Sequence, residues 1–278
     1  RRDGTRFMVG MPGEDVSAAN FDTGAVHMYS WGTAAAISTL LPTADAGDPN
    51  GSPWFDRFGS SVDYDRTLAI IGAPYDSSNG LFFNGSATIA AVSGSGFTGP
   101  AVKISGAQSM DLYGWSVALD VFQGVGMPAA TSSVVAAVGA IGDDTSGFDG
   151  GAVYTYRADS LTNTPTQGEL TGLAANSLGV VTAYDGGEFD QFGLAIAIDG
   201  GGNSDVEQTG TGQVGGIRLA VGANVNGSAT GNAYVYRYWG NVDEWVGQTY
   251  LANSGAYSTT EAGNQFGWSV GIAEQRLV

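Results

Sequence analysis

The chain has 278 residues, including 45 glycines and no cysteine, and its 27 acidic residues against 10 basic ones give a formal net charge of −17. This length suits one large all-β domain or two small ones, and the lack of cysteine excludes disulfides, zinc–thiolate sites and thiol catalysis. So acidic a chain repels phosphate backbones, and no apolar run approaches the ~20 residues of a membrane span, so we expect neither nucleic-acid binding nor a transmembrane helix.

Short apolar segments alternate along the chain with glycine-rich turns, and three motifs recur in a fixed order. The first segments are RFMVGMP (6–12) and GAVHMY (24–29). DRFGSSVDYD (56–65) then opens with an aromatic–glycine pair, and LAIIGAP (68–74) and GSATIA (85–90) follow it. The same motifs return as DLYGWSVALD (111–120), VAAVGAI (135–141) and GAVYTY (151–156), then as DQFGLAIAID (190–199), RLAVGAN (218–224) and GNAYVY (231–236), and last as NQFGWSVGIA (264–273).

Each round of motifs predicts four short strands, because a looser fourth segment such as EWVGQTYL (244–251) completes it. The first motif alternates large residues on one face with small ones, such as Ser61 and Ser116, on the other, which fits an innermost strand crowded near a central axis. The second motif is apolar on both faces, as expected of a strand buried between sheets. Four-stranded antiparallel units repeated radially make a β-propeller, so we predict an all-β propeller with about four blades in this chain. A parallel β-solenoid is the alternative.

The aromatic–glycine and Gly-Ala-Pro motifs resemble FG-GAP repeats, the blades of integrin-α-type propellers. The resemblance covers nearly the whole chain, and it is strongest to the subtype of extracellular bacterial and algal proteins with a DGTR…VG turn and a GAVY strand. It implies a propeller that has seven blades in most relatives, an extracellular or cell-surface location, and a use in adhesion or ligand binding.

The positions of the repeated motifs predict a single propeller region over 1–278, with a partial first blade at about 1–50 and later blades starting near 56, 111, 190 and 264. A closed four-bladed ring would pair 266–273 with the strand that starts at residue 6. However, 276–278 align with the same strand positions as 6–8, so we favour part of a larger propeller in a longer repeat protein. Open sheet edges pair with other strands, so we expect other protein chains, or the rest of a longer polypeptide, as partners.

Two connections carry enough side-chain oxygens to make calcium a candidate cofactor, since this ion takes six to eight oxygen ligands from a flexible loop. The connection 199–216 has Asn203, Asp205 and Glu207 at alternate positions, although it lacks the glycine and the closing Asp of an integrin-type calcium loop. The second candidate set is Asp143, Asp144 and Asp149, in GDDTSGFDGG (142–151). A solvated acidic loop is the alternative for that set.

Other residues with functional chemistry also have structural interpretations. The only histidine, His27, lies within a predicted strand, where a structural role is favoured over a Ser-His-Asp triad, and no hydrolase motif appears, so we predict no enzyme. Trp54, in the loop DPNGSPWFD, is the candidate for stacking on a glycan. N-glycosylation patterns begin at Asn50, Asn84 and Asn226, all in predicted loops.

A short polar residue precedes each aromatic–glycine pair by two positions, namely Asp56, Asp111, Asp190 and Asn264. We predict that it accepts backbone N–H bonds and fixes the turn into the inner strand. Taken together, the sequence favours a non-catalytic extracellular adhesion or structural module of a surface assembly. A lectin-like, carbohydrate-binding propeller is the alternative, since function resides in loops that the fold does not specify.

Overall fold

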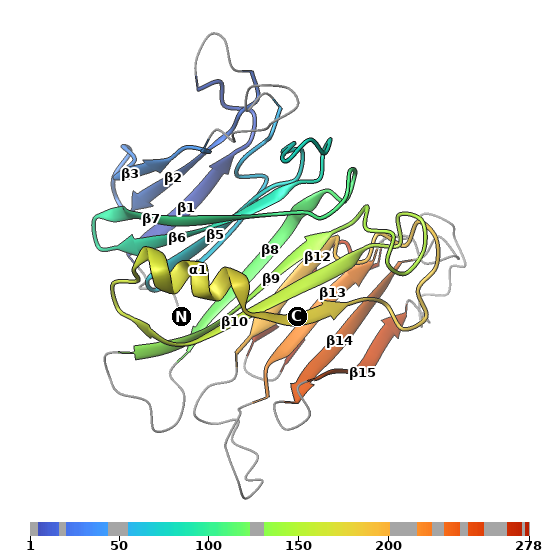
Figure 1. The fold of residues 1–278 in the computed structure, drawn as a ribbon. Coiled ribbons are helices and arrows are strands. Elements are labelled where there is room, and N and C mark those ends of the chain that lie inside the picture. The colour runs from blue at the N-terminus through green and yellow to red at the C-terminus, as the bar shows by residue number, and fades with distance from the viewer. Residues whose placement is uncertain are drawn as a thin grey trace, which may run out of the picture.

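The computed structural model describes residues 5–16, 21–43, 55–122, 131–200, 216–223, 231–239, 244–252, 266–273 and 276–277. Within these ranges the chain is almost entirely β-strand, and every strand pair is antiparallel (Figure 1). No helix in this part of the chain is long and apolar enough to cross a membrane.

Each sheet is a simple meander, in which strands that follow one another in the sequence are also neighbours in space. Sheet 1 contains β1 (Arg6–Met11), β2 (Ala25–Ser30) and β3 (Ser38–Leu40). Sheet 2 contains β4 (Ser61–Asp65), β5 (Leu68–Ala73), β6 (Ser86–Ser93) and β7 (Gly96–Ser105). Sheet 3 contains β8 (Tyr113–Phe122), β9 (Thr131–Ala140), β10 (Ala152–Thr162) and β11 (Ser177–Val181), and sheet 4 contains β12 (Ala195–Asp199), β13 (Arg218–Ala223), β14 (Asn232–Trp239) and β15 (Glu244–Ala252). This topology confirms four-stranded antiparallel units and excludes the parallel solenoid.

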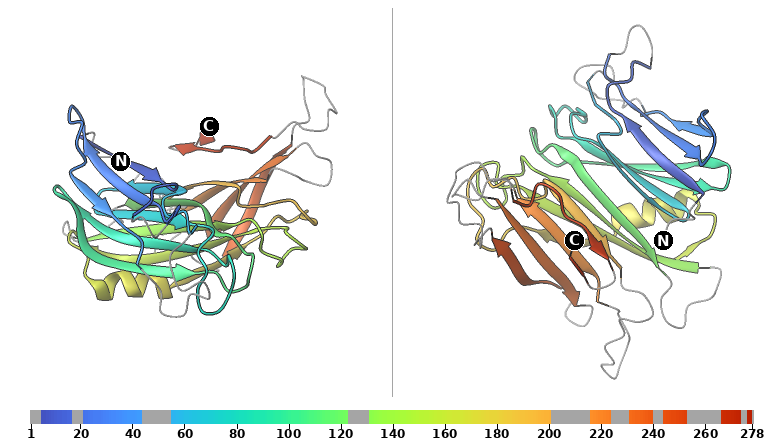
Figure 2. Two further views of the ribbon diagram at one scale, coloured as in Figure 1. Left: turned by 90° about the horizontal axis from the view of Figure 1, so that it is seen from above. Right: turned by 180° about the vertical axis from the view of Figure 1, so that it is seen from behind.

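The aromatic–glycine motifs lead into the innermost strands, as predicted. β4, β8 and β12 each form one edge of their sheet. β4 lies against β8, and β8 lies against β12, so these edges line up along the inside of the molecule. Figure 2 shows the sheets fanned out in chain order from sheet 1 to sheet 4.

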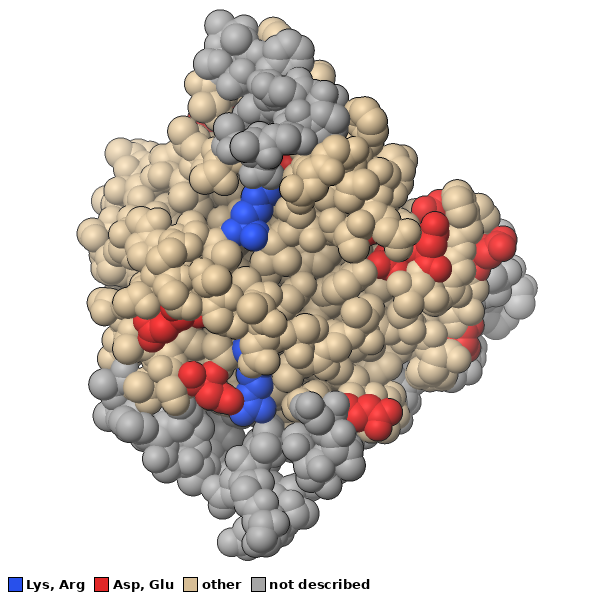
Figure 3. All heavy atoms as spheres, viewed as in Figure 1, with Lys and Arg blue, Asp and Glu red and all other residues tan. Residues whose placement is uncertain are grey.

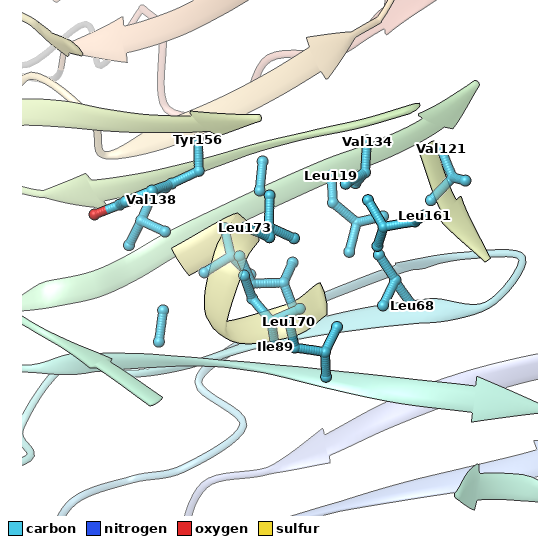
Figure 4. Packing of buried hydrophobic residues seen from close by; sticks show 14 of the residues in the cluster. Leu68, Ile89, Leu119, Val121, Val134, Val138, Tyr156, Leu161, Leu170 and Leu173 are labelled. Atoms are coloured by element: carbon cyan, nitrogen blue, oxygen red, sulfur yellow. The ribbon is translucent and has the colours of Figure 1, made fainter. Parts of the chain in front are cut away.

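Three apolar clusters fill the spaces between consecutive sheets. Val26 and Met28 of sheet 1 pack on Ile71 of sheet 2. Between sheets 2 and 3 the cluster includes Ile89 and Val138 (Figure 4), and a third cluster joins sheets 3 and 4. The second strands of sheets 2 and 3, β5 and β9, are buried on both faces because each contributes alternate residues to two of these clusters; β5 is buried along its entire length.

A short helix that the sequence analysis did not predict lies between β10 and β11. α1 (Gln167–Ala175) begins at Thr166, whose hydroxyl accepts from the Glu169 N–H while the Glu169 carboxylate accepts from the Thr166 N–H, a capping box. Its buried residues Leu170 and Leu173 enter the cluster between sheets 2 and 3 (Figure 4).

The last described strands form their own hairpin. β16 (Ile272–Ala273) pairs with β17 (Arg276–Leu277), and Ile272 lies opposite Leu277 just as Tyr64 lies opposite Ala69 in sheet 2. β17 therefore occupies the second-strand position, as the sequence alignment predicted. In the described ranges β1 pairs with β2 alone, so 266–273 and β1 do not form one closed blade.

Candidate functional site

The aromatic–glycine pair joins each sheet to the preceding one. Phe58 is buried, and its backbone N–H donates to the carbonyl of Thr23, just before β2 of sheet 1, at 3.0 Å. Tyr113 donates in the same way to the carbonyl of Asn84, just before β6 of sheet 2, at 3.1 Å. Gly59, which follows Phe58, has a φ of 91°, a left-handed conformation that favours glycine. The motif is therefore a fixed junction between sheets.

The glycine of the second motif completes this junction. A Cβ on Gly72 would collide with the carbonyl oxygen of Gly114, so only glycine lets sheet 3 approach sheet 2 this closely. Ser61, on the small-residue face of β4, donates its hydroxyl to that same carbonyl at 2.9 Å. The arrangement recurs one sheet further along at Gly139, Gly193 and Ser116.

The acidic residue before the aromatic–glycine pair fixes the turn, as predicted. Asp111 accepts a hydrogen bond from the Gln108 N–H at 2.8 Å, and Asp190 accepts one from the Gly187 N–H at 2.6 Å. Both carboxylates are buried. Burial raises the pKa of Asp111 to about 6, with a further increase from nearby Asp143, although the Gln108 N–H opposes this shift.

A second carboxylate recurs in the loop after the second strand of sheets 1, 2 and 3, and its partner differs from sheet to sheet. Glu14 pairs with His27 at 2.6 Å, and Asp76 pairs with Lys103 at 2.5 Å. The third carboxylate, Asp143, accepts a hydrogen bond from the Tyr154 hydroxyl at 2.6 Å. The only histidine and the only lysine of the chain thus serve the same repeated position.

His27 lies between a hydroxyl and a carboxylate, an order that can activate a nucleophile in hydrolases. Its Nδ1 is 2.9 Å from the Thr39 hydroxyl and its Nε2 is 2.6 Å from Glu14. The equivalent carboxylates nevertheless bind a lysine in sheet 2 and a tyrosine in sheet 3, where no such relay exists. The repetition therefore supports a structural role for His27.

The structure does not bring the predicted calcium ligands Asp143, Asp144 and Asp149 together in one cluster. Asp143 is fully buried and accepts from the Thr145 N–H and the Tyr154 hydroxyl, while Asp144 accepts from the Asp149 N–H at 2.8 Å. Across the part of the chain that the structure describes, no three His, Asp or Glu side chains are grouped to hold a metal ion. Asp143 and Asp144 bind groups of their own loop and of β10, and calcium at this set stays a prediction.

The predicted glycan at Asn84 conflicts with the fold. The Asn84 side chain is fully buried, and its Nδ2 donates to the Gly106 carbonyl at 2.8 Å and to the Ser78 hydroxyl at 3.0 Å. A glycan on this nitrogen would replace one of these two N–H donors and would have to displace the surrounding core. The remaining predicted residues, Asn50, Trp54, Asn203, Asp205, Glu207 and Asn226, lie outside the described residues.

Exposed apolar side chains, which the sequence analysis did not single out, form pairs at the sheet junctions. At the three junctions between sheets 1 and 4, the residue before the buried Asp donates its N–H to the carbonyl of a phenylalanine in the neighbouring loop, at 2.8–3.1 Å. We call these the rim pairs: Phe21 with Phe55, Phe82 with Met110, and Phe148 with Phe189. All six side chains are 50–57% exposed. The sequence could have revealed them by their position, because each lies three residues before either the glycine of the third motif or the buried aromatic residue.

The comparisons with known proteins support the repeat assignment. No curated protein matches the chain. Residues 46–89 match the family model described as the FG-GAP repeat. This segment contains Phe58-Gly59, β4, β5 and the Gly-Ala-Pro turn, and thus residues that sheet 2 contributes to its junctions with sheets 1 and 3. The chain therefore contains an FG-GAP repeat, and the resemblance inferred from the motifs is confirmed there.

Proposed function

We propose that this chain is a non-catalytic adhesion or structural module that acts in contact with other protein at an extracellular surface. The location and the adhesive role are what FG-GAP repeats imply. The observation that carries the proposal is the outward face of sheet 1, which has the residue pattern of an interface.

Phe7, Val9 and Met11 of β1 occupy the positions that Ala69, Ile71 and Ala73 hold in β5. The β5 residues are buried against sheet 1. Val9 and Met11, in contrast, are 37% and 42% exposed. In the described ranges no strand pairs with the free edge of β1, where β4 pairs with β5 in sheet 2. An apolar face beside an open edge is a site for protein association.

Light scattering over a range of concentrations tests this proposal on residues 1–278. We expect self-association, and we expect Val9→Lys with Met11→Lys to reduce it, because charges on an edge strand oppose pairing. The matched control is Val180→Lys with Val246→Lys, two exposed valines on β11 and β15. A monomer at every concentration, or equal effects of both double variants, would contradict the proposal.

Carbohydrate binding is the second candidate, and an exposed aromatic stack on sheet 1 favours it. Trp31 is 70% exposed, with its ring centroid 5.3 Å from that of Phe7, which in turn stacks on Tyr29 at an interplanar angle of 13°. Such a platform can stack on the face of a sugar ring. A glycan array probed with the wild type and Trp31→Ala tests it: binding that Trp31→Ala abolishes supports the lectin, and an array without signal contradicts it.

A further inference from the structure

We propose that the rim pairs form a docking surface for an extended, cationic polypeptide segment that carries apolar side chains. The inference rests on the proposed function, because it gives the partner chemistry of an interaction module. It concerns a different surface, however: the loops after the second and fourth strands rather than the outward face of sheet 1.

The first argument is conformational. Phe55, Met110 and Phe189 have φ values of 65°, 72° and 63°. Bulky side chains rarely adopt this left-handed region, which Gly and Asn occupy at lower cost. The same unfavourable conformation at three successive junctions, each time with an apolar side chain directed into solvent, indicates a role for the side chain itself.

The second argument is that the rim residues stay exposed where other aromatic residues already join the sheets. The aromatic residues that join the sheets are Phe58, Tyr113 and Phe192, which are all buried. Each rim pair is joined by its backbone hydrogen bond, and the rings of Phe148 and Phe189 also meet edge to face, with centroids 5.4 Å apart. About half of each side chain remains in water, and exposed apolar area of this kind marks interaction surfaces.

The third argument concerns charge and identifies the partner. The rim loops carry the exposed carboxylates of Asp15, Asp144, Asp185 and Glu188. In the described parts of these loops Arg57 is the only basic residue, and its guanidinium lies 5.1 Å above the ring of Tyr75. Figure 3 shows acidic side chains gathered along the right-hand edge, over the β9–β10 and β11–β12 loops. This field repels anionic lipid and attracts Lys or Arg.

The side chains themselves favour a polypeptide over a sugar. Phe and Met offer no polar group to hydroxyls, whereas they pack well on aliphatic and aromatic side chains. Because the connections after second and fourth strands leave the same end of every meander, the pairs follow one another from junction to junction. An extended segment can therefore contact more than one pair.

The test uses residues 1–278 and an alternating Leu-Lys peptide long enough to span two junctions, with binding followed by calorimetry. The rim variant combines Phe55→Asn, Met110→Asn and Phe189→Asn, because Asn tolerates positive φ and should leave the melting temperature unchanged or raised. The control variant combines Val180→Thr and Val246→Thr. We expect the rim variant to bind the peptide roughly tenfold more weakly than the control does.

Two further probes separate the alternatives. A Ser-Lys peptide and a Leu-Glu peptide should both bind much more weakly than Leu-Lys, because the first lacks apolar contacts and the second is repelled. Absence of Leu-Lys binding, equal binding by the rim variant, or equal binding of Ser-Lys would overturn the proposal. Binding to neutral phosphatidylcholine vesicles that the rim variant loses would assign the surface to lipid and overturn it as well. None of these outcomes depends on self-association through sheet 1.

Discussion

Gly114 lies at the close contact between sheets 2 and 3, and a substitution there tests how strictly this junction requires glycine. Its φ is 91°, and a Cβ there would collide with the carbonyl oxygen of Ser86. We expect Gly114→Ala to lower the free energy of unfolding by ~3 kcal/mol or more. Gly32 is the control, because its φ is also positive, at 81°, but its Cβ would meet nothing within 4 Å.

Gly32→Ala should cost only ~1 kcal/mol, the cost of the backbone conformation alone. Urea denaturation of both variants gives the two values. Equal losses would show that the sheets separate enough to accept a methyl group, and the close glycine contact would then contribute little to the junction.

Asp111 makes stability depend on pH in a defined direction. Burial raises its folded pKa from 3.8 to about 6, so the folded state binds this proton more tightly than the unfolded state does. Its contribution is therefore fully present below the unfolded pKa and is lost as the pH rises through about 6. Asp111→Asn keeps an oxygen acceptor for the Gln108 N–H and carries no charge.

We expect Asp111→Asn to exceed the wild type by ~1–2 kcal/mol in free energy of unfolding at pH 7, and to lose this advantage near pH 4. Chemical denaturation at a series of pH values measures the difference. Asp185→Asn, in an exposed loop, is the control for removing one negative charge. A constant difference between Asp111→Asn and the wild type would show that burial does not shift this carboxyl.

At the scale of single elements, α1 is held by its cap and by two leucines rather than by helix propensity. Its sequence includes Gly168 and Gly172, which disfavour a helix. We expect Leu173→Ala to cost ~2–4 kcal/mol through the cavity it leaves, and Thr166→Ala to cost ~1 kcal/mol through loss of the cap. Thr171→Ala, on the exposed side, should be neutral or slightly stabilising. Thermal unfolding of the three variants checks this order, and a neutral Leu173→Ala would exclude α1 from the core.

The strands could be predicted from the sequence because their pattern repeats. Close contact between sheets requires glycine at each described junction, and a buried aromatic accompanies it in sheets 2 to 4, so both recur in register. α1 has no counterpart in the other sheets, and its capping box alone is a weak signal. The rim pairs also recur, but exposure depends on how loops from two sheets meet, which the sequence does not state. Asn84 shows the converse, since a turn-like Asn-Gly-Ser is buried by the next sheet.

For the whole molecule, the net charge of −17 should make stability rise with salt. Mutual repulsion of carboxylates destabilises a compact state, and the screening length falls from ~30 Å at 0.01 M to ~10 Å at 0.1 M salt. We expect NaCl to raise the melting temperature by several degrees over this range. CaCl2 at the same ionic strength gives the comparison for the connection 199–216, predicted from sequence to bind calcium. In CaCl2 the melting temperature of the wild type should rise further than in NaCl. A variant with Asn203→Ala, Asp205→Ala and Glu207→Ala should lack this further rise. A melting temperature that does not change with NaCl would show that the carboxylates of the folded chain lie too far apart to repel one another. Equal melting temperatures of the two proteins in CaCl2 would show that the connection 199–216 is an acidic loop without a calcium site.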